Sequence, residues 1–457
     1  MTNRRKRRNR LPSEAVNLTI SGLSHEGRGI AHIEGKVAFV DGALEGEEVT
    51  ANYLRSRSQF AELKINEILS ASAERVSPPC EYTGICGGCS LQHWAADKQL
   101  DFKQSVLCEY LQHAANLQPG KYTLLPQIKA QTTHYRRKAR LAVRKVVKKG
   151  GVLVGFREKY SSFITDMHDC QVLVKEVAAL ILPLREFLTN LNASSEIPQI
   201  EVAAGEVDCE NNSGLKVARV IRHLVPLSAA DLTALREFAN AHEIDIYLQA
   251  GGLDSVCKLD QSAGPERLHY FLPGFDLQLA FHPTDFTQVN GEINRLIVSR
   301  AVAMLELEQT DTVLDLFCGL GNFTLPIARH CGRVVGIEGS DAMVARGNEN
   351  AKLNNIVNAE FYAADLSAAI DSKCWYQQAY SKVLLDPPRS GAIEIIPQIA
   401  KLGARKIIYI SCNPATLARD AAELIRQGYK LNSAGVMDMF PHTTHVESMA
   451  EFVLPSN

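Results

Sequence analysis

The chain has 457 residues, which is more than one hydrophobic core usually serves, so its length predicts two or three domains. Hydrophobic residues make up 46% of it and charged residues 22%, as in ordinary globular proteins, and no apolar run is long enough to span a membrane. The amino terminus lacks the apolar segment of a signal peptide, so we expect a cytoplasmic protein without a membrane partner. The net charge of −2 means that any contact with nucleic acid would depend on local basic patches. No feature indicates an obligate protein partner.

The first predicted segment is a basic tail, residues 1–13, which contains the run RRKRRNR. Its composition predicts disorder, and it would either contact phosphates loosely or remain solvated. Residues 14–75 follow with short alternating runs such as AVNLTI and GKVAFVDG, divided by glycine-containing turns. This pattern predicts a small antiparallel β-barrel.

A central region, residues 76–280, begins with the stretch CEYTGICGGCS, in which Cys80, Cys86 and Cys89 have the spacing C-x5-C-x2-C. In a reducing compartment the odd total of 11 cysteines argues against a disulfide framework, so these thiols are expected to share a metal. Structural zinc sites usually have a second close cysteine pair, which is missing here, so an iron–sulfur cluster is favoured and zinc is the alternative. The local sequence does not decide which distant cysteine supplies a fourth thiolate.

A basic strand is predicted within residues 134–150, HYRRKARLAVRKVVKKG, which contain eight Lys or Arg and no acid. Alternation places Ala139, Leu141 and Val143 on one face of this strand, and its other face is cationic. Because like charges along one face repel each other, the pattern favours contact with a polyanion, the alternative being a solvated face.

From residue 281 to residue 457 the pattern changes to alternating strands and helices. Near-continuous apolar runs such as TVLDLF, RVVGIEG, KVLLDPP and KIIYISCNP end in Gly, Asp or Pro. They predict a doubly wound α/β domain with a parallel sheet, whose ligands bind at the carboxyl ends of the strands.

The first of these strand ends carries Gly319 and Gly321 but lacks the third glycine of a dinucleotide fingerprint, which disfavours NAD. The second ends in Glu338, where a carboxylate can accept hydrogen bonds from both hydroxyls of a ribose. The third ends near Asp365, which is suited to an adenine amino group, although such an Asp is as often a helix cap. A nucleoside cofactor without a pyrophosphate is therefore expected, and S-adenosylmethionine fits.

Three further residues are candidates for the chemistry. Asp386 stands in DPPRSG, where two prolines stiffen the exit from the fourth strand, and Cys412 follows the fifth strand at the same edge. Glu447 lies in PHTTHVES together with His442 and His445, which lack the remaining ligands of a zinc site.

These motifs together resemble the family of uracil-5-methyltransferases that act on RNA. The resemblance covers nearly the whole chain and rests on FTQVN, DLFCGLGNF, LLDPPRSG, SCNPATLARD and PHTTHVESM. The stretch CEYTGICGGCSLQH resembles the iron–sulfur branch of the family, and residues 14–75 are similar to a TRAM domain, an RNA-binding barrel of the OB type. The resemblance implies an α/β fold with a carboxyl-terminal Rossmann-like class I methyltransferase domain, an amino-terminal TRAM barrel and a central iron–sulfur domain.

The resemblance also implies roles for individual residues. Cys412 would add to C6 of uracil so that C5 can take the methyl group, and Glu447 would then remove the C5 proton. A 4Fe-4S cluster would be bound by Cys80, Cys86 and Cys89 with Cys170 as the distant fourth ligand, a choice that local sequence alone would not make over Cys108 or Cys209. The S-adenosylmethionine site would be lined by Gln288, Phe317, Asn322, Glu338, Asp365 and Asp386.

The domain combination resembles the branch that methylates 23S rRNA, so this RNA is the expected partner and substrate. Two alternatives remain at this point. One is a sister enzyme acting on tRNA or on another ribosomal uridine, although the tRNA-type relatives lack the cysteine group. The other is a catalytically silent RNA-binding assembly factor, against which the presence of both Cys412 and Glu447 argues.

Overall fold

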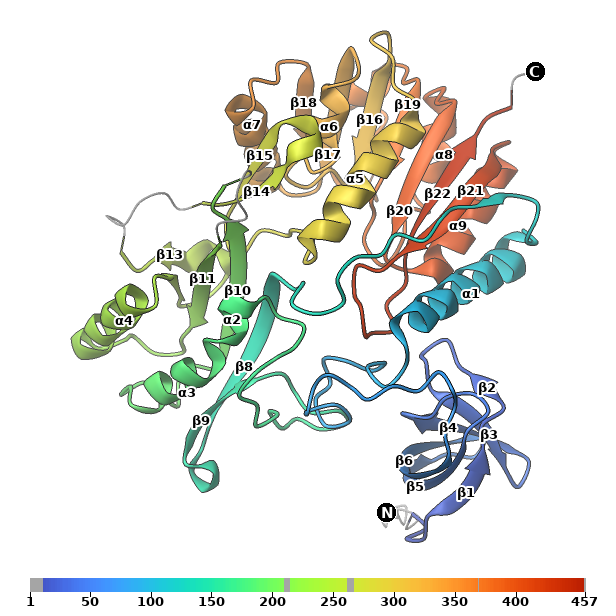
Figure 1. Ribbon diagram of the computed structural model, residues 1–457. Helices are drawn as coiled ribbons and strands as arrows, with labels where there is room; N and C mark the ends of the chain where they lie inside the picture. Colours follow the sequence, from blue (N-terminus) through green and yellow to red (C-terminus); the bar gives the residue numbers. More distant parts are fainter. Residues whose placement is uncertain (1–10, 209–213, 261–266, 369, 456–457) are drawn as a thin grey trace, which may run out of the picture. The chain divides into compact units, whose positions relative to one another are not determined.

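A computed structural model describes residues 11–208, 214–260, 267–368 and 370–455 (Figure 1). The chain forms two compact units, one of residues 1–101 with 442–444 and the other of residues 102–441 with 445–457, and each is described by itself. The run of arginines in the predicted basic tail lies outside the described residues. None of the helices that the model describes is both long and apolar enough to cross a bilayer. The domain boundaries expected at residues 75 and 280 stay predictions.

The first unit contains a six-stranded sheet in the order β1-β5-β6-β4-β3-β2, which packs around a core of aliphatic side chains, most of them from the strands. The predicted barrel is confirmed, but its strictly antiparallel pairing is wrong for one pair. Strands β4 and β6 run parallel, because β6 rather than β5 lies beside β4. The strands are β1 (Val16–Thr19), β2 (Gly22–Leu23), β3 (Gly29–Ile33), β4 (Lys36–Asp41), β5 (Glu48–Ser56) and β6 (Phe60–Ser70).

The second unit begins with a six-stranded sheet in the order β13-β12-β11-β10-β8-β9 and a separate hairpin of β14 and β15. The predicted basic strand is β8, and its alternation is confirmed, since Ala139, Leu141 and Val143 are buried while Arg140 and Arg144 are exposed. The strands are β8 (Lys138–Val146), β9 (Gly151–Gly155), β10 (Gln199–Glu206), β11 (Leu215–Arg222), β12 (Asp245–Gln249), β13 (Val256–Lys258), β14 (Leu268–Leu272) and β15 (Leu277–Phe281).

An eight-stranded sheet follows in the order β18-β17-β16-β19-β20-β22-β21-β7. Strands β16 to β20 are mutually parallel, as their apolar runs predicted, whereas β22 enters antiparallel between β20 and β21. The strands are β7 (Thr123–Leu124), β16 (Thr312–Leu316), β17 (Arg333–Glu338), β18 (Ala359–Ala363), β19 (Lys382–Leu385), β20 (Lys406–Ser411), β21 (Lys430–Met437) and β22 (Glu447–Val453).

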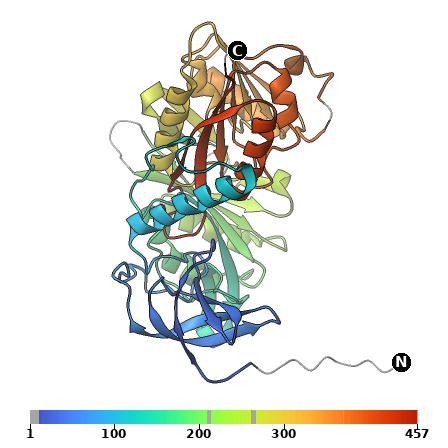
Figure 2. The same cartoon turned by 90° about the vertical axis from the view of Figure 1, so that its right-hand side faces the viewer.

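Helices cover both faces of this sheet, and Figure 2 shows α5 and α9 on opposite sides of it. Two of these helices begin at asparagine caps, because the side-chain oxygens of Asn290 and Asn413 accept hydrogen bonds from the first turns of α5 and α9. The helices are α1 (Ala96–Ala115), α2 (Lys175–Ala178), α3 (Ile181–Thr189), α4 (Ala229–Ala241), α5 (Gly291–Leu305), α6 (Thr324–Ala328), α7 (Asp341–Leu353), α8 (Ile396–Lys401) and α9 (Pro414–Arg426).

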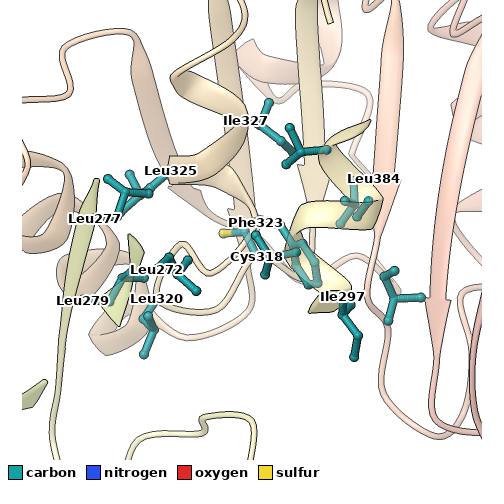
Figure 3. Packing of buried hydrophobic residues seen from close by; sticks show 14 of the residues in the cluster. Leu272, Leu277, Leu279, Ile297, Cys318, Leu320, Phe323, Leu325, Ile327 and Leu384 are labelled. Carbon is teal, nitrogen blue, oxygen red and sulfur yellow. The ribbon is translucent and has the colours of Figure 1, made fainter. Parts of the chain in front are cut away.

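The loop after β16 is anchored in the core of the second unit. Leu320 belongs to the same buried group as Leu277 and Leu279 of β15, and Phe323 and Cys318 lie between them and α5 (Figure 3). Apolar contacts on its core side therefore hold the glycine-rich turn in place. The turn itself lies at the carboxyl ends of the strands, where ligands bind in such sheets.

Candidate active site

The two residues expected to carry the chemistry lie at neighbouring positions of the sheet. Strand β20 pairs with β22 in antiparallel register, and the last pair is Ser411 with Ser448. Cys412 follows Ser411 and Glu447 precedes Ser448, so both stand one residue beyond this pair at the same edge. Glu447 reaches the carboxyl ends of the parallel strands because β22 runs against them and begins there.

Local hydrogen bonds fix the backbone around Cys412. The Ser411 hydroxyl accepts a bond from the Asn413 amide at 3.1 Å and donates one to the Asn413 carbonyl at 3.0 Å. Asn413 then caps α9, in which Pro414 occupies the first turn, so the strand ends and the helix begins on either side of the thiol. Cys412 is partly buried in this strand-to-helix turn.

The pKa values of the site show how closely its acids interact. Burial raises the pKa of the Cys412 thiol to about 11, and the negative charges of Glu447 and Asp386 act in the same direction. Burial also raises the pKa of Glu447 well above its usual range, again with a contribution from Asp386, and it raises the pKa of Asp386 to about 7. A thiol and two carboxyls therefore share one low-dielectric site, where ionisation of each disfavours ionisation of the others.

Arg389 lies close enough to act on Cys412 and Glu447, which its place in the motif DPPRSG did not by itself indicate. Its positive charge lowers the pKa of both Cys412 and Glu447, against the effect of burial. A guanidinium nitrogen of Arg389 lies 3.2 Å from Nδ1 of His445, and the Asn413 amide group donates to the Arg389 carbonyl at 3.1 Å. Arg389 is thus a cation of this acidic site, and Lys103 also lowers the pKa of Glu447.

The DPPRSG loop is held by a second group that sequence did not indicate. The Asp420 carboxylate accepts hydrogen bonds from the Ala392 amide and the Tyr409 hydroxyl, each at 2.7 Å. Arg419 donates to the Ser390 carbonyl at 2.8 Å. Gly391 has φ +82°, and a Cβ there would lie 2.6 Å from the Asp420 carboxylate, so this close approach requires glycine.

The loop after β16 has the conformation of a cofactor turn. Phe317, Gly319 and Gly321 have φ values of +64°, +56° and +97°. The Glu338 carboxylate accepts hydrogen bonds from the Gly319 amide at 3.0 Å and from the Gly339 amide at 2.8 Å. The predicted residues Phe317 and Glu338 are therefore brought together at the ends of adjacent strands, and the Asp386 amide joins them by donating to the Leu316 carbonyl at 3.2 Å.

Two more predicted residues, Asn322 and Gln288, share the neighbours Asn294 and Tyr270. Asn322 and Asn294 exchange two amide hydrogen bonds of 2.9 and 3.0 Å, and the Tyr270 hydroxyl donates to Asn322 at 2.8 Å. Gln288 lines a small pocket together with Tyr270 and Asn294. The helix and hairpin residues Asn294 and Tyr270 thus orient Asn322, and no sequence pattern marked either of them.

Asp365 differs from the other predicted residues. Its side chain is exposed and accepts hydrogen bonds from the Ser367 hydroxyl at 2.6 Å and the Ser367 amide at 2.9 Å, and the hydroxyl bond holds the pKa of Asp365 below its usual range. The side chain thus closes a turn, and the helix cap that the sequence left open is not formed, because residues 366–368 form a turn and no helix begins there. The backbone still places Asp365 beside Glu338, since the Ala364 amide donates to the Glu338 carbonyl at 2.9 Å.

Asp315, within β16, is fully buried below the cofactor loop. Burial raises its pKa to about 8, and the charges of Asp386 and Glu338 add to this effect. One carboxylate oxygen accepts a 2.5 Å hydrogen bond from Thr324, and the other has no hydrogen-bond partner among the residues that the model describes. The hydrogen bond between Asp315 and Thr324 thus connects β16, before the loop, with α6, after it. Because Asp315 stands inside an apolar run, the sequence did not indicate this role.

The three clustered cysteines lie in the first unit, on a loop that we name the cysteine loop, residues 80–89. The Cys80 amide donates to the side chain of Gln92 at 3.2 Å, and the Gly88 amide donates to the Cys86 sulfur at 3.4 Å. Cys170 is buried in the second unit. Within the described ranges, no group of three or more His, Cys, Asp or Glu side chains is arranged to hold a metal ion.

Comparisons with known proteins agree with this arrangement. Residues 229–452 match the model of the tRNA (Uracil-5-)-methyltransferase family, and residues 10–62 match that of the TRAM domain. The chain is 50% identical over 447 residues to the 23S rRNA (uracil(1939)-C(5))-methyltransferase RlmD of Alcanivorax borkumensis, and 49% identical to the protein of that name from Hahella chejuensis. These alignments cover 98% of this chain and 98% and 99% of those relatives.

Among solved structures, the tRNA (uracil-54, C5)-methyltransferase of Pyrococcus abyssi, in complex with S-adenosyl-L-homocysteine, has the same fold. It superposes with a TM-score of 0.71 at 22% identity and covers 96% of this chain and all of that one. The predicted fold and family are confirmed: the chain belongs to the RNA uracil-5-methyltransferases, together with the proteins named RlmD.

Proposed function

We propose that the protein uses S-adenosylmethionine to methylate C5 of a uridine in 23S rRNA through a covalent adduct between Cys412 and C6 of uracil. The observation that carries the chemistry is the register of β20 and β22, which sets Cys412 and Glu447 at one sheet edge beside Asp386. The choice of RNA rests on relatives named for 23S rRNA at about half identity over nearly the whole chain.

The first step requires a thiolate, because C5 of uracil is a poor nucleophile until a nucleophile has added to C6. Addition of the Cys412 sulfur to C6 moves the C5–C6 electron pair onto C5 and the adjoining carbonyl. The thiol must first lose its proton to water; burial opposes this ionisation, and the charge of Arg389 favours it. S-Adenosylmethionine, when bound, supplies the electrophilic methyl group.

The second step regenerates the enzyme. C5 then carries both the new methyl group and its original hydrogen, and Glu447 takes that proton. The electron pair of the C–H bond re-forms the C5–C6 double bond, the C6–S bond breaks, and Cys412 leaves as the thiolate. A carboxylate with a raised pKa suits this task, since it binds a proton more strongly than an ordinary glutamate.

We assign cofactor binding to the residues grouped around the loop after β16. Glu338 would accept hydrogen bonds from the ribose hydroxyls, and Asp365 would turn from Ser367 toward the adenine amino group. The donor set suits a nucleoside without a pyrophosphate, because the loop offers two glycines instead of three. The other residues of this assignment are Gln288, Phe317, Asn322 and Asp386.

The substrate base must leave its stack to reach Cys412, which costs a few kcal/mol and favours single-stranded or looped RNA. The TRAM barrel and the exposed arginines of β8 would contact phosphates. The reaction is expected in the cytoplasm, where the partner rRNA is made.

We further propose that Cys80, Cys86, Cys89 and Cys170 bind a 4Fe-4S cluster. Thiolates are the ligands that such clusters require, and the Gly88 amide that faces the Cys86 sulfur is the kind of contact that supports a metal-bound thiolate. The cluster would supply a covalent link between segments distant in sequence. None of the proposed steps requires it to change its redox state.

The function is tested with 23S rRNA from cells that lack this protein. Purified protein and S-adenosylmethionine carrying a labelled methyl group should introduce 5-methyluridine at one position of this RNA, and tRNA should remain unlabelled. Labelling of tRNA instead would assign the protein to the sister enzymes. No labelling of either RNA, with RNA binding intact, would indicate an assembly factor.

A further inference from the structure

The loop that leads into Glu447 is held by contacts that the proposed mechanism does not use. This loop, residues 438–446, joins β21 to β22 and is called here the base-bearing loop. Its residues 442–444 pack within the first unit, with the barrel and the cysteine loop. His442 has φ +66°, a backbone conformation that residues other than glycine rarely adopt. The contacts around His442 must therefore hold it in this conformation.

Gln99 is the centre of these contacts. Its side chain is 1% exposed, and its carbonyl oxygen accepts a hydrogen bond from the His442 amide at 2.9 Å. Its amide nitrogen donates to the Leu91 carbonyl at 3.0 Å and to the Trp94 carbonyl at 2.7 Å. A single buried amide therefore connects the segment after the cysteine loop with the strained residue of the base-bearing loop.

The same segment also binds the backbone carbonyl group of His442. The amides of Ser90 and Leu91, which follow Cys89 directly, donate to the His442 carbonyl at 2.9 and 3.0 Å. Both backbone polar groups of His442 are thus bound by residues 90–99. Thr444 lies three residues before Glu447 in the chain. A displacement of residues 442–444 would therefore shift Glu447 through this short stretch of backbone.

The barrel contributes a third contact. Gly27, in the turn between β2 and β3, has φ +65°, and a Cβ placed there would lie 2.8 Å from a methyl carbon of Leu91 and 2.8 Å from the methyl carbon of Thr444. Gly27 of the barrel turn, Leu91 after the cysteine loop and Thr444 of the base-bearing loop therefore meet with no room for one more carbon atom.

Lys103 holds the beginning of the base-bearing loop within the second unit. Its ammonium group is buried and donates to the Asp438 carboxylate at 2.6 Å and to the Phe440 carbonyl at 3.0 Å. Lys103 follows Gln99 by four residues in α1, so the two side chains lie on one face of that helix. Helix α1 therefore binds the base-bearing loop at two points.

We infer that Gln99 is a positioning residue for the catalytic base, and that the contacts of residues 90–99 and Gly27 with residues 442–444 set the place of Glu447 through the short backbone stretch that joins them. This inference rests on the proposed function, in which Glu447 acts after methyl transfer. Disturbing these contacts should leave Cys412 and the cofactor residues in place and impair the removal of the C5 proton. The amino-terminal segments would then act in the elimination step as well as in binding RNA.

The test measures the elimination step separately from methyl transfer. Gln99→Met keeps the length of the side chain and removes the hydrogen bonds that this side chain makes with His442, Leu91 and Trp94. It should slow release of methylated RNA by about 10- to 100-fold, the usual effect of a misplaced catalytic group. Methylated RNA bound covalently to the protein should accumulate, with little change in the KM for S-adenosylmethionine.

A matched pair of glycine variants provides the control. Gly27→Ala and Gly35→Ala both force alanine into a left-handed conformation, at φ +65° and +80°, but the new Cβ at position 35 meets no atom within 4 Å. Gly27→Ala should therefore accumulate the methylated adduct and Gly35→Ala should not. This pair decides the question even if Gln99→Met does not fold.

Glu447→Gln separates failure of the inference from failure of the proposed function. If Glu447→Gln accumulates the adduct while Gln99→Met and Gly27→Ala lose methyl transfer and elimination to the same extent, the positioning role is wrong. If Glu447→Gln itself accumulates no adduct, the proposed role of Glu447 is wrong, and the inference falls with it.

Discussion

Ser411 and Ser448 pair directly across β20 and β22, and this pair sets Cys412 and Glu447 side by side at the edge of the sheet. Cys412, the proposed nucleophile, follows a parallel strand at its carboxyl end, whereas Glu447, the proposed base, begins an antiparallel strand at its amino end. One reversed strand therefore brings together two residues 35 positions apart in sequence. A parallel β22 would have carried Glu447 to the opposite edge.

Variants of Cys412 and Glu447 should be blocked at different steps of the reaction. Cys412→Ala removes the sulfur that activates C5, so neither an adduct nor methylated RNA should form. Glu447→Gln keeps the shape of the side chain but cannot take the C5 proton, so addition and methyl transfer proceed and elimination stalls. The measurement is a denaturing gel of RNA with a labelled methyl group, on which only Glu447→Gln should give a protein-sized band. Product formation by Cys412→Ala would contradict the assignment.

Removing the charge of Arg389 should shift the pH dependence of the reaction. Arg389 lowers the pKa of both Cys412 and Glu447, so Arg389→Met should raise both. Because both groups act in their deprotonated forms, the rising limb of kcat/KM against pH should move to higher pH, and alkaline buffer should restore part of the rate. Arg426→Met, an exposed arginine at the end of α9, serves as the control. Equal profiles for wild type and Arg389→Met would exclude this role.

Cofactor affinity should depend strongly on Glu338. Glu338→Ala removes the acceptor of the Gly319 amide as well as the proposed ribose acceptor. Loss of a charge-assisted hydrogen bond costs about 1.5–3 kcal/mol, which weakens binding by about 10- to 150-fold. Calorimetry with S-adenosylhomocysteine measures this change. Glu360→Ala, on adjacent β18 and paired with Arg333, should bind normally, and comparable losses in the two variants would argue against a specific role.

The two exposed arginines of β8 should differ in their effect on RNA binding. Arg140 is paired with Glu201 on β10, with nitrogen–oxygen distances of 2.6 and 2.9 Å, so its charge is already partly compensated. Arg144→Glu should therefore lower affinity and reduce the salt slope by about one phosphate contact, and Arg140→Glu should do so less. Binding isotherms at several salt concentrations test this. Lys352→Glu, on the exposed face of α7, controls for net charge.

The cysteine loop should bind iron. Protein purified without oxygen should be brown, with about four irons and as many sulfides per chain. Cys86→Ser should lose iron and sulfide, whereas Cys257→Ser, at an exposed cysteine outside the proposed set, should retain both. Stoichiometric zinc without iron or sulfide would overturn the cluster assignment.

Much of the architecture followed from local sequence alone. Continuous apolar runs ending in Gly, Asp or Pro predicted β16 to β20, because a strand buried on both faces has few polar positions and its ligand-binding residues stand mostly at its end. The same logic selected Glu338, Asp386 and Cys412. The alternation of β8 was likewise readable, since one buried face alternates with one exposed face.

Other features could not be read from the chain. Nothing local shows that β4 pairs parallel with β6, or that Glu201 compensates Arg140, because strand neighbours are chosen by tertiary packing. Asp315 lies within an apolar run, so only the folded structure reveals its burial beside Thr324. The placement of Arg389, beside Cys412 and Glu447, required the DPPRSG loop to be folded against α9.

The sequence by itself determined which residues are candidates for the chemistry and, through its strand ends, on which edge of the sheet most of them stand. Only the tertiary structure decided how they are brought together and held. Glu447 meets Cys412 because β22 is reversed and inserted in one register, and Gln99 reaches His442 across 343 positions of sequence. Such contacts arise from loop closure and packing between distant segments, which leave no periodicity in the chain.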